Sequence, residues 1–312
     1  MQAPIEISVV SGKGGTGKTI LTSSLAFLLD EKVIADCDVD APDLHLLLNP
    51  AIKERHSFMG MSKARIKPEL CSGCGRCREV CRFDAVIQED GRLYEIDTLL
   101  CEGCSVCQWF CPEQAIEMVE VEAGEWYISE TRVGSFVHAR LSPAQENSGK
   151  LVTIVRREAR KLAIEKGLKM VLIDGPPGIG CPVIASITGA KLAMLVVEPT
   201  ESGIHDLQRI YSLAKHFDIA CCAVINRFDL NMEMSWRIEE FLLEQNIPLW
   251  GKIPFSYQVN EAISRGRIIV EDAPQDPVSG VIRKIAASLR EFVISNYADA
   301  GASKHSEDRS QG

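Results

Sequence analysis

The cysteine spacing is the feature of this sequence that most clearly predicts chemistry. The pattern C-x2-C-x2-C-x3-C occurs twice, thirty residues apart, at Cys71, Cys74, Cys77, Cys81, Cys101, Cys104, Cys107 and Cys111. Thiolates are soft ligands, and two such runs are typical of proteins that hold two [4Fe–4S] clusters. Zinc is the alternative, but zinc sites usually take four ligands from paired knuckles. We therefore expect two iron–sulfur clusters in this segment.

The spacing resembles that of bacterial two-cluster ferredoxins, in which the fourth cysteine of each run binds the cluster of the other run. The ligands that this implies are Cys71, Cys74, Cys77 and Cys111 for the first cluster, and Cys101, Cys104, Cys107 and Cys81 for the second. Pro112 follows Cys111 as the pattern requires, but Arg82 follows Cys81. This departure removes no ligand and places a cation near a cluster, where it favours the reduced state.

A second motif predicts phosphate binding near the N-terminus. Residues 12–19 (GKGGTGKT) match G-x4-G-K-[ST] between an apolar run and a helical pattern. Backbone N–H groups of such a loop close around phosphates; Lys18 should reach the β- and γ-phosphates and the Thr19 hydroxyl should bind Mg²⁺. The expected nucleotide contacts are Gly12, Gly14, Gly15, Thr16, Gly17, Lys18, Thr19 and Ile20. A glycine-rich turn without function would leave these lysine and threonine positions unexplained.

Composition limits the class of protein. The chain has 312 residues, 46% hydrophobic and 25% charged, which is ordinary for a soluble globular protein. A net charge of −9 argues against non-specific nucleic-acid binding. No signal sequence and no membrane-spanning apolar run is visible, so we expect a cytoplasmic protein. Disulfides are improbable in the reducing cytoplasm. Cys221 and Cys222 are expected to be small core residues.

Strand and helix signals alternate on both sides of the cysteine segment. Apolar runs predict strands near 5–10, 33–35, 170–173, 192–197 and 219–225, and helical patterns cover 19–29, 151–166, 204–216, 234–245 and 281–297. Residues 126–149 are a possible hairpin. This pattern predicts a doubly wound, mostly parallel α/β domain, in parts 1–62 and 123–297, interrupted at 63–122 by an α+β domain like a bacterial ferredoxin. Residues 298–312 are expected to be a disordered tail.

Lys13 gives the loop a more specific resemblance. With it, the loop resembles the deviant phosphate loop of the ParA/MinD/Mrp ATPases and the nitrogenase iron protein. In that family this lysine crosses a dimer interface to the partner's nucleotide. The resemblance therefore implies an ATPase that is slow and stimulated by a partner, and that forms a nucleotide-dependent dimer with itself or with a similar ATPase.

Three further segments resemble parts of the same family. Residues 36–40 resemble its switch I, and residues 174–178 (DGPPG) its Walker B and switch II. This implies that Asp38 orients the attacking water and that Asp174 holds Mg²⁺ through water; Asp36 and Asp40 are alternatives to Asp38. Asn226 matches the position that reads adenine, with a turn-forming asparagine as the alternative. Pro254 lies in a stretch that resembles the border of the adenine site.

Nearly all of residues 5–295 resembles the MinD-like ATPases with an inserted ferredoxin domain. The leading hypothesis is an ATPase whose nucleotide state gates electron transfer through two [4Fe–4S] clusters to an unidentified redox or cluster-accepting protein. A carrier that delivers metal or clusters is one alternative, weakened because no C-x2-C pair follows Cys111. A MinD/ParA-like spatial organiser is the other. The role of Cys181, just after the switch II segment, stays open.

Overall fold

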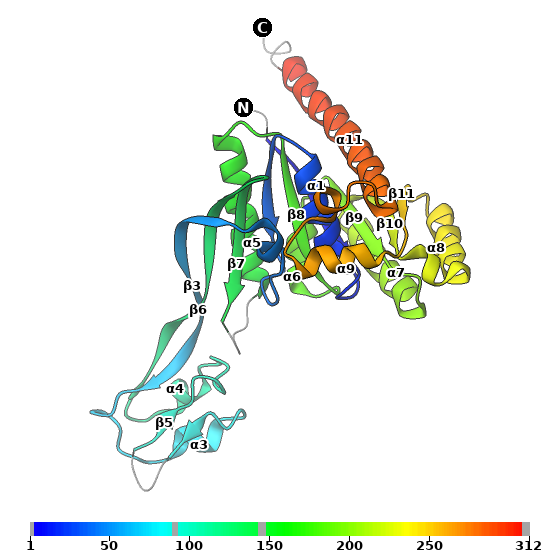
Figure 1. The fold of residues 1–312 in the computed structure, drawn as a ribbon. Coiled ribbons are helices and arrows are strands. Elements are labelled where there is room, and N and C mark those ends of the chain that lie inside the picture. The colour runs from blue at the N-terminus through cyan, green and yellow to red at the C-terminus, as the bar shows by residue number, and fades with distance from the viewer. Residues whose placement is uncertain (1–2, 89–92, 143–147, 308–312) are drawn as a thin grey trace. The chain divides into compact units, whose positions relative to one another are not determined.

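The computed structural model describes residues 3–88, 93–142 and 148–307 (Figure 1). The chain divides into two compact units, one of residues 1–55, 126–140 and 148–312 and the other of residues 56–125 and 141–147. The second unit contains all eight cysteines of the repeated pattern. This second unit is longer at both ends than the inserted domain predicted from the sequence, which covers residues 63–122.

A nine-stranded sheet organises the first unit. Its strands are β1 (Ile5–Ser11), β2 (Lys32–Asp36), β3 (Ala51–Ile66), β6 (Ile116–Thr131), β7 (Gly134–Leu141), β8 (Met170–Pro177), β9 (Leu192–Val197), β10 (Ala220–Asn226) and β11 (Leu249–Ile253). Their order is β11-β10-β9-β1-β8-β2-β7-β6-β3. The pairs from β11 to β7 are parallel. The carboxyl ends of these strands therefore meet at one edge, where ligands of open α/β sheets bind.

Helices cover both faces of the sheet (Figure 1). They are α1 (Lys18–Leu28), α2 (Leu44–Leu48), α5 (Ser148–Glu165), α6 (Cys181–Ile187), α7 (Glu201–His216), α8 (Met232–Glu244), α9 (Tyr257–Ser264), α10 (Ile269–Asp272) and α11 (Pro277–Glu307), with a 3-10 turn at Phe228–Leu230. Successive strand residues enter opposite cores: Val9 packs with α1 and α11 residues, and Val10 packs with α6 and α7 residues. The predicted doubly wound architecture is confirmed.

The expected strands and helices are found close to their predicted bounds, but two segments differ. The 16-residue strand β3 was not expected, because Ala51 to Ser57 carry exposed or half-exposed side chains with no apolar alternation. The possible hairpin at 126–149 is β6 and β7, and β6 starts ten residues earlier, at Ile116. Helix α11 continues to Glu307, into the segment expected to be disordered, and residues 308–312 lie outside the described part.

The cysteine unit is built from two equivalent halves. Besides residues 56–66 of β3 and 116–125 of β6 it contains α3 (Arg76–Val80), β4 (Val86–Ile87), β5 (Glu95–Ile96) and α4 (Val106–Phe110), with β4 and β5 antiparallel. Left-handed backbone occurs at positions thirty residues apart: 73 and 103, 75 and 105, 84 and 114. The halves also exchange matching backbone bonds, from Lys67 N to Ala115 O (2.7 Å) and from Asp97 N to Ala85 O (2.8 Å). The internal repeat predicted from the sequence is confirmed at the level of the backbone.

Candidate functional site

The phosphate-loop motif lies between the end of β1 and the start of α1. Gly15 and Gly17 have φ values of 78° and 89°, which an L side chain rarely adopts. A Cβ atom on Gly17 would lie 2.4 Å from Asn226 Nδ2, and one on Gly12 would lie 2.2 Å from Asp206 Cβ. Gly14, by contrast, faces open space. The glycines thus fit a loop that is packed at both ends and open in the middle.

Two buried carboxylates lie next to this loop on adjacent strands. Asp36 and Asp174 are direct neighbours across the β2–β8 pairing. The Thr22 hydroxyl, one turn after Lys18 on α1, donates to Asp174 Oδ1 (2.9 Å), a contact that the sequence analysis missed. Burial raises the pKa of Asp174, while the Lys18 charge and hydrogen bonds from Thr19 and Thr22 oppose the rise.

Asp36 and its surroundings supply oxygen atoms suited to a hard cation. Asp36 Oδ1 accepts from Asp38 N (3.0 Å), but the buried Oδ2 has no hydrogen-bond partner among the described residues. Burial, and then the Asp174 charge, raise the pKa of Asp36 well above its usual range. Carboxylate and hydroxyl oxygens from Asp174 and Thr19 are the ligand type that Mg²⁺ prefers, so these residues fit that ion.

The three aspartates after β2 have different surroundings. Asp36 is buried, Asp38 is partly buried, and Asp40 is exposed. Burial raises the pKa of Asp38 to about 6, and the Lys18 charge opposes that rise. Asp38 therefore lies within the field of the phosphate-loop lysine while keeping access to water. Among the three, its surroundings best suit a group that must accept a proton or orient a water.

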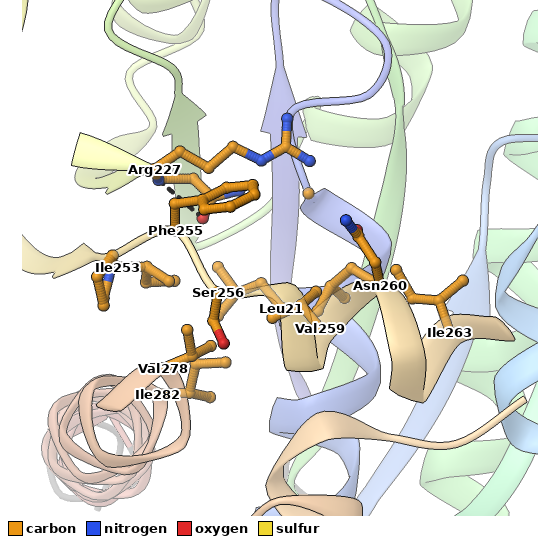
Figure 2. A pocket seen from close by; sticks show the side chains of 14 residues that line it. Leu21, Arg227, Ile253, Phe255, Ser256, Val259, Asn260, Ile263, Val278 and Ile282 are labelled. Carbon is orange, nitrogen blue, oxygen red and sulfur yellow. Dashed lines mark hydrogen bonds between the residues drawn. The ribbon is translucent and has the colours of Figure 1, made fainter. Parts of the chain in front are cut away.

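A pocket beside the loop brings together four residues predicted to contact nucleotide: Gly17, Ile20, Asn226 and Pro254 (Figure 2). Ile253, in the stretch that resembles the border of the adenine site, also lines the pocket. The sequence analysis missed the other lining residues, which are Leu21, Arg227, Phe255, Ser256, Val259, Asn260, Ile263, Val278 and Ile282. Two local signals could have found some of them. Arg227 directly follows Asn226, and Phe255 and Ser256 directly follow Pro254.

Asn226 connects the pocket to the loop. Its Nδ2 atom donates to Thr16 O (2.8 Å), and its Oδ1 atom accepts from Arg227 N (3.1 Å). The Arg227 side chain is in turn paired with Glu198 (2.6 Å). In this structure Asn226 therefore positions the loop backbone. Lys13, at the other end of the loop, is exposed and has no ion pair among the described residues.

The eight repeated cysteines line two separate cavities. Cys71, Cys74, Cys77 and Cys111 line the first, and Cys81, Cys101, Cys104 and Cys107 line the second. The fourth cysteine of each run thus lies with the first three of the other run. All eight are free thiols, and burial raises the pKa of Cys107 to about 11.

These quartets do not form a site for a single ion. No three His, Cys, Asp or Glu side chains within residues 3–88, 93–142 and 148–307 converge on one metal position. A tetrahedral zinc site needs four ligand atoms about 2.0–2.3 Å from one centre. Thiols are soft donors of the kind that iron–sulfur clusters take, so the donor types around each cavity fit such a cluster.

The remaining four cysteines are not part of these cavities. Cys37 and Cys222 are buried, and burial raises the pKa of both well above the usual range. Burial also raises the pKa of the half-buried Cys221 to about 12. Cys221 and Cys222 are therefore protonated thiols packed in the core, as expected. Cys181 is exposed at the first residue of α6.

Comparison with known proteins identifies the family. Residues 7–269 match the model of the CobQ/CobB/MinD/ParA nucleotide binding domain, which is most of the chain. The chain belongs to this family. The loop, the two buried aspartates and the adjoining pocket are the candidate nucleotide site within this fold.

Relatives cover nearly the whole chain. An uncharacterised protein of Methanocaldococcus jannaschii is 32% identical over 293 residues, covering 93% of this chain and 98% of the relative. An uncharacterised ATP-binding protein of the same organism is 30% identical, covering 91% and 87%. The septum site-determining protein MinD of Pyrococcus horikoshii, solved with Mg-ADP, has the same fold with a TM-score of 0.58 and 16% identity, covering 93% and 97%.

The helices of the described residues include none that is both long enough and apolar enough to cross a bilayer.

Proposed function

We propose that this protein binds and hydrolyses ATP, and that its nucleotide state controls electron transfer through two [4Fe–4S] clusters to a partner protein. One observation carries the proposal. The eight repeated cysteines separate into two quartets of crossed composition, each around its own cavity, in a chain that also has a MinD/ParA-type nucleotide site. Neither part alone requires the other, so their combination points to coupling.

In the nucleotide half, each side chain has a role that follows from its surroundings. The open backbone around Gly14 and Gly15 receives the phosphates, and Lys18 neutralises their charge. Thr19 and Asp174 hold Mg²⁺, and Thr22 fixes the orientation of the Asp174 carboxylate. Asp38 accepts a hydrogen bond from the attacking water. The related ATP-binding protein of M. jannaschii supports ATP as the nucleotide.

The exposed Lys13 supports a dimer. With no ion pair inside the described part of its own chain, its ammonium is available to a nucleotide bound by a second subunit. That subunit is another copy of this chain or a similar ATPase. Electrostatic stabilisation of the transferred phosphoryl group by this lysine explains why turnover would depend on a partner.

In the cysteine half, the chain supplies thiolates and backbone donors. Cys71, Cys74, Cys77 and Cys111 hold one cluster, and Cys101, Cys104, Cys107 and Cys81 hold the other. Such clusters, when bound, take up and release single electrons. Ala64 N donates to Cys101 Sγ (3.5 Å) and Ala115 N donates to Cys111 Sγ (3.3 Å). Donors to cluster sulfur favour the more negative, reduced state and so raise the potential.

A spatial organiser is the second candidate, favoured by the MinD proteins of similar fold. That role explains the nucleotide site but gives the eight cysteines no purpose. A carrier with a labile cluster is less well supported, because Cys221 and Cys222 are protonated core thiols and no other cysteine follows Cys181.

Metal analysis of anaerobically purified protein tests the proposal. It should find about eight iron and eight sulfide per chain, as two [4Fe–4S] clusters require, with magnetic resonance of two interacting reduced centres. Lys18→Ala should keep this iron and lose ATP binding. Stoichiometric zinc in place of iron would exclude the redox function and leave the spatial organiser as the better account.

A further inference from the structure

The two halves of the cysteine unit have equivalent backbones but different surfaces. Residues 66–87 form the first half-repeat and residues 96–117 the second. Their short helices, left-handed residues and exchanged hydrogen bonds correspond at a spacing of thirty. A residue and the one thirty positions later therefore occupy equivalent places. Since one backbone accepts both side chains, differences between them are not required by the fold.

The cavity walls differ at such equivalent positions. Arg76 and Glu113 line the first cavity, and their equivalents Val106 and Phe83 line the second. The first cavity thus has two charged side chains in its wall where the second has two apolar ones.

The apolar character continues from the second cavity onto the outer face of α4. Val106, Trp109 and Phe110 stand at i, i+3 and i+4, which places them on one helix face. Trp109 is 84% exposed and Phe110 is 58% exposed. The position equivalent to Trp109 on α3 is Glu79, an exposed acid.

The turn before Cys101 repeats this difference. Leu99 is 61% exposed, and its equivalent in the first half-repeat is Glu69. Leu100 and its equivalent Leu70 are both exposed leucines. We call Val106, Trp109 and Phe110 on α4 the second-repeat apolar surface. Exposed aromatic and aliphatic side chains that the fold does not need are typical of an interaction site.

Charge also distinguishes the halves. The first half-repeat contains Lys67, Arg76, Arg78 and Arg82 and three acidic residues, whereas the second has no lysine or arginine and four acidic residues. One of these, Glu102, lines the second cavity beside Val106 and has no ion pair among the described residues. Glu102 thus places an acidic side chain beside the second-repeat apolar surface.

We propose that the second-repeat apolar surface docks a redox protein whose own contact face is apolar and ringed by lysine or arginine. An apolar centre with a charged rim is the usual anatomy of an interface, and opposite charges speed the encounter. This proposal rests on the proposed function. One electron would leave the reduced cluster held by Cys101, Cys104, Cys107 and Cys81 and would reduce the partner's redox centre by one electron. No covalent bond forms or breaks.

Stopped-flow electron transfer with defined probes tests this docking site. The full-length protein, with its iron content verified and its clusters reduced, is mixed without oxygen with cytochrome c as a basic probe or plastocyanin as an acidic one. Cytochrome c should be reduced faster than plastocyanin, and added salt should make the two reduction rates more similar because it screens the charges. Trp109→Ser should slow the reduction of cytochrome c about tenfold, the size of effect expected at the centre of an interface. Glu79→Gln is the matched control at the equivalent position on α3 and should leave that rate unchanged.

A neutral quinone, which needs no protein docking, separates this proposal from the proposed function. Wild type and Trp109→Ser should reduce the quinone at equal rates. If the chain holds no iron–sulfur cluster, both proposals fail. If the quinone is reduced but Trp109→Ser leaves the cytochrome c rate unchanged, only the docking site is wrong. Sedimentation would also overturn the docking proposal if the wild-type protein forms a dimer that Trp109→Ser converts to a monomer. The surface would then be an interface between two copies of this chain.

Discussion

At the scale of single residues, burial distinguishes side chains that the sequence leaves equivalent. Asp36, Asp38 and Asp40 are three aspartates at alternate positions, and only the structure separates them. Asp36 is buried beside Asp174, Asp40 is exposed, and Asp38 lies between these extremes near Lys18. We therefore propose Asp38 as the residue that orients the attacking water.

This assignment predicts a pH dependence. Burial raises the pKa of Asp38 to about 6, so the carboxylate is protonated below that pH and cannot accept a hydrogen bond from water. The value of kcat/KM for ATP should rise as pH increases through about 6 and then level off. Asp38→Asn should abolish turnover, while Asp40→Asn should keep both turnover and the profile. A normal profile in Asp38→Asn would assign the role to another group.

The two loop lysines should give different defects. Lys18 is buried in the loop, and Lys13 is exposed at its edge. Lys18→Ala should abolish nucleotide binding in calorimetry. Lys13→Ala should bind ATP normally but lose hydrolysis and ATP-dependent dimerisation in sedimentation, because its charge acts on the other subunit's nucleotide. Full turnover by an ATP-independent monomer would contradict the dimer.

At the scale of elements, the phosphate loop depends on one close approach between segments distant in sequence. Gly17 has φ 89°, and a Cβ atom there would collide with the Asn226 amide that holds Thr16 O. Gly17→Ala should lower the free energy of unfolding by about 1–3 kcal/mol through backbone strain and lost packing. Gly14→Ala, which meets no atom within 4 Å, should unfold within about 0.5 kcal/mol of wild type. Urea unfolding of the nucleotide-free protein measures both.

The crossed quartets predict which cavity a single substitution disturbs. Cys81 lies in the first run of the sequence but lines the cavity of the second run. Cys81→Ser should therefore damage the cluster held by Cys101, Cys104 and Cys107, and Cys111→Ser should damage the other. Magnetic resonance of the reduced variants distinguishes the remaining cluster by its changed signal. Loss of the same cluster in both variants would show that the ligation is not crossed.

Local patterns predicted most elements, the position of the phosphate loop and the cysteine runs, but neither most of the residues that line the adjoining pocket nor the contacts between distant segments. The loop glycines and the cysteine runs are contiguous motifs, so their spacing sufficed. The hydrogen bond from Asn226 to Thr16 joins residues 210 positions apart, and no local pattern indicates it. Strand β3 was missed because its first residues are exposed and charged. It is a strand because it pairs with β6, and this pairing depends on the tertiary structure rather than on the local sequence.

At the scale of the whole molecule, the chain itself joins the two functions. The cysteine unit is inserted between Asp38 and Asp174, and β7, which follows it, pairs directly with β2, the strand that leads into Asp36 and Asp38. Loss of γ-phosphate and Mg²⁺ contacts on hydrolysis moves such switch segments. β2 and β7 share a hydrogen-bonded ladder, so we propose that a shift at Asp38 reaches the chain segments that lead to the cysteine unit.

A redox titration in the presence of ATP, ADP or no nucleotide tests the central claim most directly. Cluster potential responds to charge and solvent exposure, so ATP should shift the midpoint potential of at least one cluster; tenfold coupling corresponds to about 59 mV for one electron. By linkage, reduction should change ATP affinity by the same factor. The shift should be absent in Lys18→Ala. Identical midpoint potentials in all three nucleotide states of the wild-type protein would contradict nucleotide-controlled electron transfer.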